Sequence, residues 1–361
     1  MSRSAASTTV TRPPRADTDA IAAGAAGGRN VVVVGGGLLG LEAAAGVRAR
    51  GGRVTVVEAA DRLMPQQLDE GGARALSGAL ARLGIEARTA CAVERIGPRA
   101  LHLSSGEELP ADVVVMAAGV RAETSLARAA GIEVERGVLV GDDLRTSAPG
   151  VWAVGECAEH RGVVHGLWAP AAEQARVAGA SLCGDPAAFL GAVQATTLKV
   201  AGVDVFAGGR AMATGGQAEV LWSDGRVGAY RKLVLEPDGS LAGALLVGDA
   251  AGARELSALL RDGGAVPESV LGPPGPATSE PEGLPSRDAL VCSCNAVQAG
   301  TILDAIRDRG LTTVEQVGAS TRAGTGCGSC VRDLARLLEP DSRSRNTTVT
   351  DAKPRPARMP A

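Results

Sequence analysis

The stretch Val31-Val-Val-Val-Gly35-Gly-Gly37-Leu-Leu-Gly40 decides the fold of the first part of this chain. The run of valines predicts a buried strand, and the glycines after it predict a tight turn into a helix. A second strand, Arg53–Val57, ends on Glu58, 18 residues beyond Gly40. Strand, G-x-G-x-x-G, helix, strand and acid follow in the order of the dinucleotide-binding fingerprint. We therefore expect a Rossmann-like unit of the α/β class.

The glycines and the acid have separate expected roles toward NAD(H). Gly35 makes the tight turn, Gly37 lets the backbone approach the pyrophosphate, and Gly40 lets the helix pack on the strand. Glu58 accepts hydrogen bonds from the adenosine ribose and repels a 2′-phosphate by about 3 kcal/mol at roughly 5 Å. NADH is therefore favoured over NADPH. A glycine-rich turn without a ligand is the alternative.

Four of the seven cysteines form two close pairs, Cys292-Ser-Cys294 and Cys327-Gly-Ser-Cys330. The 32 residues between the pairs are enough for a helical hairpin that brings them together. The apolar spacing over 331–338 predicts a helix that begins beside Cys330. Four thiolates so arranged hold either one tetrahedral zinc or a two-iron cluster. The C-x-C spacing and the glycines around the second pair favour the cluster, and zinc is the alternative.

The composition narrows the class of protein. The chain has 361 residues, 45% hydrophobic but only 2% aromatic, which predicts two or three domains with cores of Ala, Val and Leu. A net charge of −3 without a basic tract argues against nucleic acid as a partner. No apolar run approaches the ~20 residues of a membrane span. The remaining cysteines stand singly, as in a reducing compartment: Cys91, Cys157 and Cys183. We expect a cytoplasmic protein with no membrane contact.

Composition shifts divide the chain into segments. In order, we expect a disordered arm (1–29), an NAD-binding Rossmann-like domain (30–136), an α/β block (137–190), an antiparallel α+β module (191–262), a linker (263–288), a small helical cluster domain (289–339) and a disordered tail (340–361). The first domain closes with a strand over 112–116 and with Gly119, a further expected cofactor contact.

The sequence around the cysteines resembles a bacterioferritin-associated-ferredoxin-type (BFD-like) [2Fe-2S] domain. The resemblance rests on Val291-Cys-Ser-Cys-Asn-Ala-Val297, Thr312-Thr-Val-Glu-Gln-Val317 and Thr325-Gly-Cys-Gly-Ser-Cys330. It covers residues 289–339. In that family four cysteines ligate the cluster, which implies the same role here for Cys292, Cys294, Cys327 and Cys330. The resemblance strongly favours iron–sulfur over zinc.

The rest of the chain resembles the pyridine-nucleotide flavoprotein part of the NADH-dependent nitrite reductase large subunit. It is also similar to electron-transfer subunits of assimilatory nitrate reductase. The motifs are Gly35-Gly-Gly-Leu-Leu-Gly-Leu-Glu-Ala-Ala44, Arg62-Leu-Met64, Ala153-Val-Gly-Glu-Cys-Ala-Glu-His160 and Thr197-Leu-Lys-Val-Ala-Gly-Val-Asp204. The resemblance implies electron flow from NADH to FAD, to [2Fe-2S], and to a terminal nitrite or nitrate reductase partner.

That family carries a separate FAD-binding βαβ unit at its start, which we expect to be missing here. Residues 137–190 would then be only the C-terminal part of an FAD-binding domain. We expect this chain alone to bind FAD weakly or not at all. We also expect self-association, or association with a partner chain, through residues 138–185, whose apolar faces would be left open. An unrecognised upstream translation start is an alternative.

The resemblance leaves four residues on the flavin side. Gly155 and Glu156 would reach the ribityl chain, and a turn after a buried strand is the alternative for this pair. Pro170 and Gln174 lie on a helix whose N-terminus would face the flavin ring.

We assign no catalytic acid or base, because hydride transfer from NADH to flavin needs none. The histidines are therefore expected to be structural or surface residues: His102, His160 and His165. After the cluster, too few cysteines remain for the sirohaem site of nitrite reduction. The leading interpretation is an NADH-dependent electron-transfer oxidoreductase component. The alternative is a truncated, non-catalytic redox-sensing or interaction module that binds NADH and a cluster.

Overall fold

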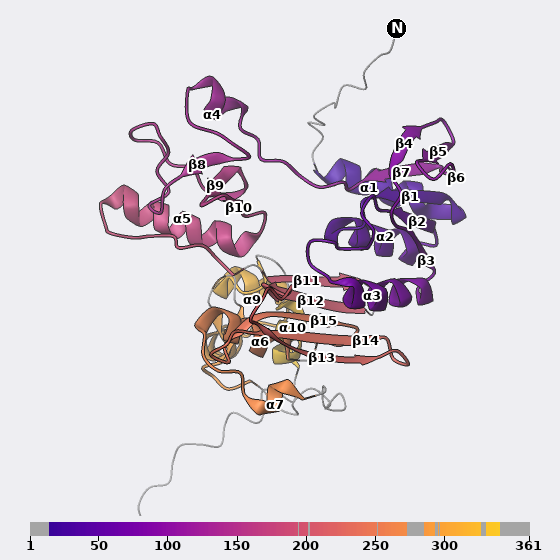
Figure 1. Ribbon diagram of the computed structural model, residues 1–361. Coiled ribbons are helices and arrows are strands. Elements are labelled where there is room, and N and C mark those ends of the chain that lie inside the picture. The colour runs from indigo at the N-terminus through magenta and orange to yellow at the C-terminus, as the bar shows by residue number, and fades with distance from the viewer. Residues whose placement is uncertain are drawn as a thin grey trace, which may run out of the picture. The chain divides into compact units, whose positions relative to one another are not determined.

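The computed structural model describes residues 14–193, 195–200, 203–250, 252–272, 285–292, 295, 297–325 and 330–339 (Figure 1). The chain divides by its internal contacts into two units. One holds residues 1–121 and 193–276, and the other holds 122–192 and 277–361.

The first unit contains a four-stranded parallel sheet (Figure 1). Its strands, in spatial order, are β3 (Ile85–Arg88), β2 (Arg53–Val57), β1 (Asn30–Val34) and β7 (Val113–Met116). The connecting helices are α2 (Leu38–Ala49) and α3 (Glu70–Arg82). The register sets Val34 of β1 beside Val57 and Met116. The predicted Rossmann-like unit is confirmed, and the carboxyl ends of β1, β2 and β7 meet at one edge.

A three-stranded antiparallel sheet lies in the chain between β3 and β7. It consists of β4 (Val93–Ile96), β5 (Ala100–Leu103) and β6 (Glu108–Pro110). Leu101 and Leu103 of this sheet are buried in one cluster with Val32 and Val57. This insertion therefore packs its apolar side chains against residues of the parallel sheet.

The helix α1 (Pro14–Ala25) precedes β1 and is followed by the short η1 (Ala26–Gly28). The expectation of a disordered arm before Asn30 is therefore wrong for this segment. Helix α1 packs against α2 and β7, and Ala25 is fully buried. A Cβ atom added at Gly24 would lie 2.8 Å from Val113 Cγ2. The small residues that suggested a flexible arm let the helix approach the sheet closely. Residues 1–13 lie outside the described residues.

The second part of the first unit is a five-stranded antiparallel sheet. Its spatial order is β11 (Ala195–Val200), β12 (Val203–Gly209), β15 (Leu241–Val247), β14 (Ala229–Leu235) and β13 (Ala218–Asp224), with helices α6 (Ala253–Asp262) and α7 (Glu268–Leu271) following. The predicted antiparallel module is confirmed. The expected linker begins too early, because Val270 of α7 is buried in the core of the module. The Val266 N–H also donates to Gly239 O at 3.0 Å.

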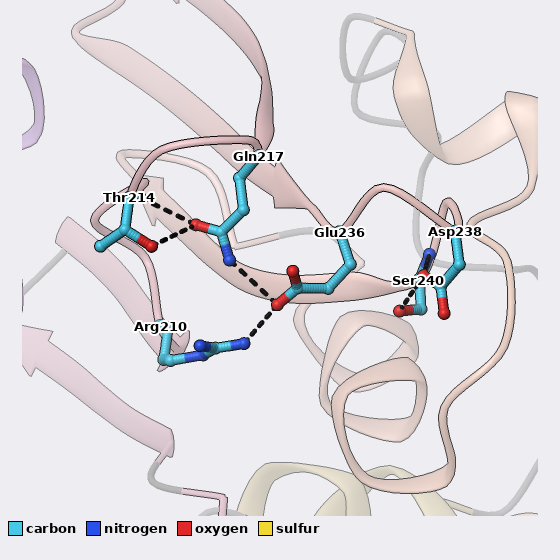
Figure 2. A network of polar contacts seen from close by, with 6 residues as sticks. All are labelled: Arg210, Thr214, Gln217, Glu236, Asp238 and Ser240. Carbon is cyan, nitrogen blue, oxygen red and sulfur yellow. Dashed lines mark hydrogen bonds and ion pairs between the residues drawn. The ribbon is translucent and has the colours of Figure 1, made fainter.

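Polar contacts fix the loop between β12 and β13 (Figure 2). Gln217 Oε1 accepts from Thr214 N at 2.9 Å, and Gln217 Nε2 donates to Glu236 Oε1 at 2.9 Å. Arg210 donates to the same carboxylate oxygen. Beyond β14, the Ser240 hydroxyl donates to Asp238 Oδ1 at 2.7 Å within the turn into β15.

The Rossmann-like part and the antiparallel module share one hydrophobic core. Leu198, Val205 and Leu245 of the module are buried in one cluster with Leu76 and Leu80 of α3. Because the two parts pack on each other through this shared core, they belong to one compact unit and are not joined by a flexible linker.

Polar groups reinforce this junction. The Tyr230 hydroxyl donates to Asp69 Oδ2 at 2.6 Å, and Lys232 Nζ lies 3.2 Å from the same oxygen. Asp69 also caps α3, because its other oxygen accepts from Gly72 N at 2.9 Å. Lys232 is 6% exposed, and it also pairs with Glu219 at 2.6 Å.

Residues 122–192 form a small α/β block. It contains α4 (Ser125–Ala129), β8 (Val138–Val140), η2 (Gly155–Cys157), β9 (Ala158–His160), β10 (Val163–Val164) and α5 (Trp168–Cys183). Strand β9 pairs in parallel with β8 and antiparallel with β10. Leu144, Val177 and Phe189 form its core.

The expected boundary after residue 136 falls instead after 121. The buried carboxylate of Glu159 explains the difference, since its Oε2 accepts from the N–H groups of Arg136 and Gly137, both at 2.9 Å. In addition, Leu139 N donates to Glu133 O at 3.1 Å. These bonds tie the segment before β8 to the α/β block.

The cysteine-bearing domain is small and mainly helical, as predicted. It contains β16 (Leu290–Cys292), β17 (Val297–Gln298), α8 (Ala299–Arg309), α9 (Val314–Thr321) and α10 (Val331–Leu338). Helices α8 and α9 form the expected hairpin between the cysteine pairs. Thr313 and Gln316 close a capping box at the start of α9. The core is built from Ile302, Val317 and Leu334. The expected tail, 340–361, lies outside the described residues.

Candidate cofactor sites

The glycine loop between β1 and α2 is the first candidate site. Gly35 has a φ of +114°, and a Cβ added there would lie 2.2 Å from Ala117 O. A Cβ at Gly40 would lie 2.0 Å from Gly35 O. Only glycine fits either position, because any side chain would collide with main-chain atoms. The loop therefore lies directly against the end of β7.

Gly37 has a different environment. It is the N-cap of α2, its φ of −81° suits any residue, and an added Cβ would meet no atom of the described residues within 4 Å. Gly119 beyond β7 has a φ of +94° and similar open space around it. The helix N-terminus with its unpaired N–H groups fits an anionic pyrophosphate, which a side chain at Gly37 would obstruct.

Glu58 lies at the carboxyl end of β2 and faces the glycine loop. Its Oε2 accepts from Gly36 N at 2.7 Å, and its Oε1 accepts from Ala60 N at 2.8 Å. The side chain is half-buried. Each carboxylate oxygen can accept a further hydrogen bond, so the acid can still receive the hydroxyls of a ribose. The residues of this site fit a nicotinamide dinucleotide.

The loop after β3 holds the main chain around Glu58 in place, and no local pattern in the sequence indicates this contact. Cys91 N donates to Glu58 O at 3.1 Å, and Ala90 N donates to Ala60 O at 2.6 Å. Ala90 has a φ of +54°, which is unusual for a residue with a side chain.

The flavin-side residues lie together in the block 122–192. Gly155, with a φ of +81°, opens the turn η2, and exposed Glu156 follows it. Gly155 N donates to Gln174 Oε1 at 2.7 Å. Pro170 is buried in the first turn of α5 and Gln174 is fully buried in the next.

An orphaned polar atom tests whether these residues fit a flavin. Among the described residues, Gln174 Nε2 is buried and has no hydrogen-bond partner. A buried amide donor without a partner costs about 1–3 kcal/mol, which an acceptor on a bound group would recover. The arrangement therefore fits a polar group beside α5.

The histidines in this block are buried, which the sequence did not predict. His160 Nε2 lies 2.8 Å from Asp142 Oδ1, and both His160 and His165 contact Phe189 edge-on. Burial, and secondarily the neighbouring His160, lowers the pKa of His165. His102 is partly exposed and lies beside Arg95 on the small antiparallel sheet.

The cysteine site is described for one residue of each pair. Cys292 and Cys330 are 2% and 3% exposed, and Cys294 and Cys327 lie outside the described residues. Burial, and then the adjoining Cys292 thiol, raises the pKa of the Cys330 thiol to about 11. Cys330 is the N-cap of α10, as predicted.

This juxtaposition is the arrangement that a metal centre needs. The thiols of Cys292 and Cys330, which come from opposite ends of the domain, lie together in one buried site. Binding an iron cluster there would displace their protons. The described part of the chain contains no group of three or more metal-ligating side chains. Cys292 and Cys330 are the two of the four candidate ligands that lie within the described residues.

Three families match the chain in succession. The pyridine nucleotide-disulphide oxidoreductase family matches residues 7–180. The rubredoxin NAD+ reductase C-terminal domain matches 195–263, and the BFD-like [2Fe-2S] binding domain matches 290–340.

Curated relatives extend over all three segments. The chain is 38% identical over 323 residues to the assimilatory nitrate reductase electron transfer subunit of Bacillus subtilis (strain 168), covering 86% of this chain and 41% of that protein. It is 33% identical over 352 residues to the nitrite reductase (NADH) large subunit of Escherichia coli (strain K12), covering 93% and 41%. The chain thus spans about two fifths of the length of these relatives.

Solved structures support the fold. An NAD-dependent persulfide reductase from A. fulgidus has a TM-score of 0.62 and 26% identity, over 69% of this chain and 51% of that one. The putidaredoxin reductase–putidaredoxin complex has a TM-score of 0.64 and 23% identity, over 73% and 65%, and shows the fold alone. Successive segments of the chain are therefore similar to pyridine nucleotide-disulphide oxidoreductases, to the C-terminal domain of rubredoxin NAD+ reductase and to BFD-like [2Fe-2S] binding domains.

Proposed function

We propose that this chain is an electron-transfer component that takes a hydride from NADH and delivers electrons through FAD and a [2Fe-2S] cluster to a nitrite or nitrate reductase. The observation that carries the proposal is the meeting of buried Cys292 and Cys330 in a chain that also holds an intact dinucleotide loop. A nicotinamide-binding loop and a thiolate-ligated cluster in one polypeptide suit the passage of electrons between them.

The preference for NADH rests on Glu58. Two main-chain N–H groups hold its carboxylate at the edge of the glycine loop, which fixes the position of the negative charge. A carboxylate fixed there accepts from ribose hydroxyls and repels a 2′-phosphate.

The glycines and the flavin-side residues bind and orient. Gly35 and Gly40 bring the start of α2 against the end of β7, and the open space at Gly37 receives the pyrophosphate. Gly155 and Glu156 would reach the ribityl chain of a flavin, and Pro170 and Gln174 would lie beside its ring. Gln174 Nε2, which has no partner among the described residues, would be a donor there. A bound flavin supplies the conversion of a two-electron hydride into single electrons.

The partner is proposed from the relatives. One of them is named as the electron transfer subunit of an assimilatory nitrate reductase, which implies a separate catalytic protein. We place this chain beside such a protein in the cytoplasm. Among the described residues, no helix has the length and apolar character needed to cross a membrane.

A redox-sensing or interaction module is the second candidate. The observation that favours it is the bond from Gly155 N to Gln174 Oε1, since both groups belong to the expected flavin site and are satisfied by each other. In that case NADH and the cluster would bind without a flavin to connect them.

A steady-state assay separates the two candidates. The protein, with its cluster reconstituted and FAD added, is mixed with NADH and a one-electron acceptor such as ferricyanide. If the chain is an electron-transfer component, ferricyanide should be reduced only when FAD is present, and much more slowly with NADPH than with NADH. If the chain is a redox-sensing or interaction module, it should bind NADH without reducing ferricyanide. That result would refute the proposal.

A further inference from the structure

Asn295 lies beside the cluster cysteines and joins the two segments that carry them. Its amide nitrogen Nδ2 donates to Arg322 O at 2.7 Å and lies 3.9 Å from Cys292 Sγ. The same nitrogen lies 3.4 Å from Thr325 Oγ1. Asn295 follows the first cysteine pair, whereas Arg322 and Thr325 belong to the loop that leads to the second.

The orientation of this amide is set by its surroundings. A main-chain carbonyl oxygen can only accept, so the atom of Asn295 that faces Arg322 O must be the NH₂ group. The NH₂ group has two hydrogens. One is used by Arg322 O, and the second is shared between Cys292 Sγ and Thr325 Oγ1.

The loop that anchors the amide is itself firmly held. Arg322 ends α9 with a φ of +66°, and its N–H donates to Gly318 O at 2.8 Å. The Thr325 hydroxyl donates to Arg322 O at 2.8 Å. A Cβ added at Gly324 would lie 2.8 Å from Leu334 Cδ1, so the loop packs closely on α10. The amide of Asn295 is therefore pre-positioned rather than free to turn.

We propose that Asn295 is a positioning residue of the [2Fe-2S] site, whose amide donates to the sulfur of Cys292 and raises the reduction potential of the cluster. The inference rests on the proposed cluster. A donor to a ligand sulfur stabilises the more negative, reduced state, and hydrogen bonds to the sulfurs are among the factors that set such potentials. A backbone hydrogen bond from Gly324 also reaches the Cys330 sulfur.

Two substitutions and a control test the role. Asn295→Ala removes the donor without adding a charge. Thr325→Val keeps the shape of the side chain but removes the oxygen that competes for the second amide hydrogen. Ser320→Ala is the control, since the Ser320 hydroxyl accepts from Arg309 Nη1 at 2.7 Å and contacts neither cysteine in the described structure.

The readouts are iron per chain, the midpoint potential from a redox titration followed by electron paramagnetic resonance, and the Fe–S(Cys) stretching frequencies. Asn295→Ala is expected to keep its iron and to shift the oxidised-to-reduced ratio at fixed potential by roughly tenfold toward the oxidised form, about 59 mV for one electron. Its Fe–S(Cys) stretch should move to higher frequency. Thr325→Val should shift the potential in the opposite direction.

An Asn295→Ala protein with full iron and the potential of the Ser320→Ala control would overturn the inference. If Asn295→Ala takes up no iron, Thr325→Val decides the matter. A raised potential in that variant supports the role of the amide, and an unchanged one overturns it. A parent protein without iron would instead refute the proposed cluster, so the two failures are distinguishable.

Discussion

Tyr230 and Asp69 are 161 residues apart in the chain, and the Tyr230 hydroxyl donates a 2.6 Å hydrogen bond to Asp69 Oδ2. Burial raises the pKa of Asp69, but the hydrogen bonds from Tyr230, Gly72 N–H and Lys232 outweigh it and hold that pKa below its ordinary value. Burial and the same bond raise the pKa of Tyr230 far above its ordinary value. Asp69 thus caps a helix of the Rossmann-like part through one carboxylate oxygen and holds a strand of the antiparallel module through the other.

Replacing Tyr230 by phenylalanine should weaken both parts together. A hydrogen bond to a charged group contributes about 1.5–3 kcal/mol, so we expect Tyr230→Phe to lower the free energy of unfolding by about 1.5 kcal/mol. Urea unfolding measures this. Ser257→Ala, which removes a bond to Ala253 O within α6, is the control and should cost less. Equal costs would show that the junction carries no special weight.

Lowering the pH should reduce the difference in the free energy of unfolding between the parent protein and Tyr230→Phe. Because the pKa of Asp69 is lowered in the folded state, its stabilisation is complete above the unfolded value of about 3.9 and is lost as the pH falls through the folded pKa. The Tyr230→Phe protein has less of this stabilisation to lose. The gap between the two proteins should therefore shrink from about pH 7 to about pH 3. A gap that widens on acidification would contradict the lowered pKa of Asp69.

Glu58→Arg should invert the cofactor preference. The change replaces repulsion of a 2′-phosphate by attraction, which alters the ratio of NADH to NADPH affinity by about 100-fold. Fluorescence titration with each nucleotide gives that ratio. Glu86→Arg makes the same charge change at an exposed site on β3 and is the control. An unchanged ratio in Glu58→Arg would mean that the acid does not face the ribose.

Alanine at two neighbouring glycines should have opposite consequences. Gly35→Ala places a methyl group 2.2 Å from Ala117 O at a positive φ, so the free energy of unfolding should fall by several kcal/mol. Gly37→Ala meets open space at a permitted φ, so stability should stay within about 0.5 kcal/mol while NADH binding weakens. Thermal unfolding with and without NADH separates the two effects. Full NADH affinity in Gly37→Ala would place the pyrophosphate elsewhere.

Serine at either described cluster cysteine should remove the whole metal centre. Purified protein is expected to hold about two irons per chain, and Cys292→Ser and Cys330→Ser should each lose both together. Iron and sulfide analysis with the visible spectrum measures this. Cys183→Ser, at an exposed cysteine, is the control and should keep its iron. One tightly bound zinc without visible absorption would contradict the electron-transfer account.

The features that could be predicted from the sequence are those with a strong local pattern. The valine run of β1 and the turn glycines predicted the Rossmann-like unit. The apolar spacing after Cys330 predicted α10. In each case the residues of one short segment carry the whole signal.

The features that were missed depend on contacts between distant segments. Helix α1 was hidden because Gly24 and Ala25 look like flexible chain, although their small size is what lets the helix pack. The bond from Tyr230 to Asp69 and the amide of Asn295 join residues whose proximity no local pattern encodes. The main-chain donors to Glu58 were missed for the same reason.

The most direct test of the central claim is the electron paramagnetic resonance spectrum of the protein after anaerobic addition of NADH. The protein carries its cluster and added FAD, and dithionite-reduced protein gives the full signal. The account predicts that NADH produces the reduced [2Fe-2S] signal, that NADPH produces it far more slowly, and that omitting FAD abolishes it. A cluster that stays oxidised with excess NADH and FAD, although dithionite reduces it, would contradict the account.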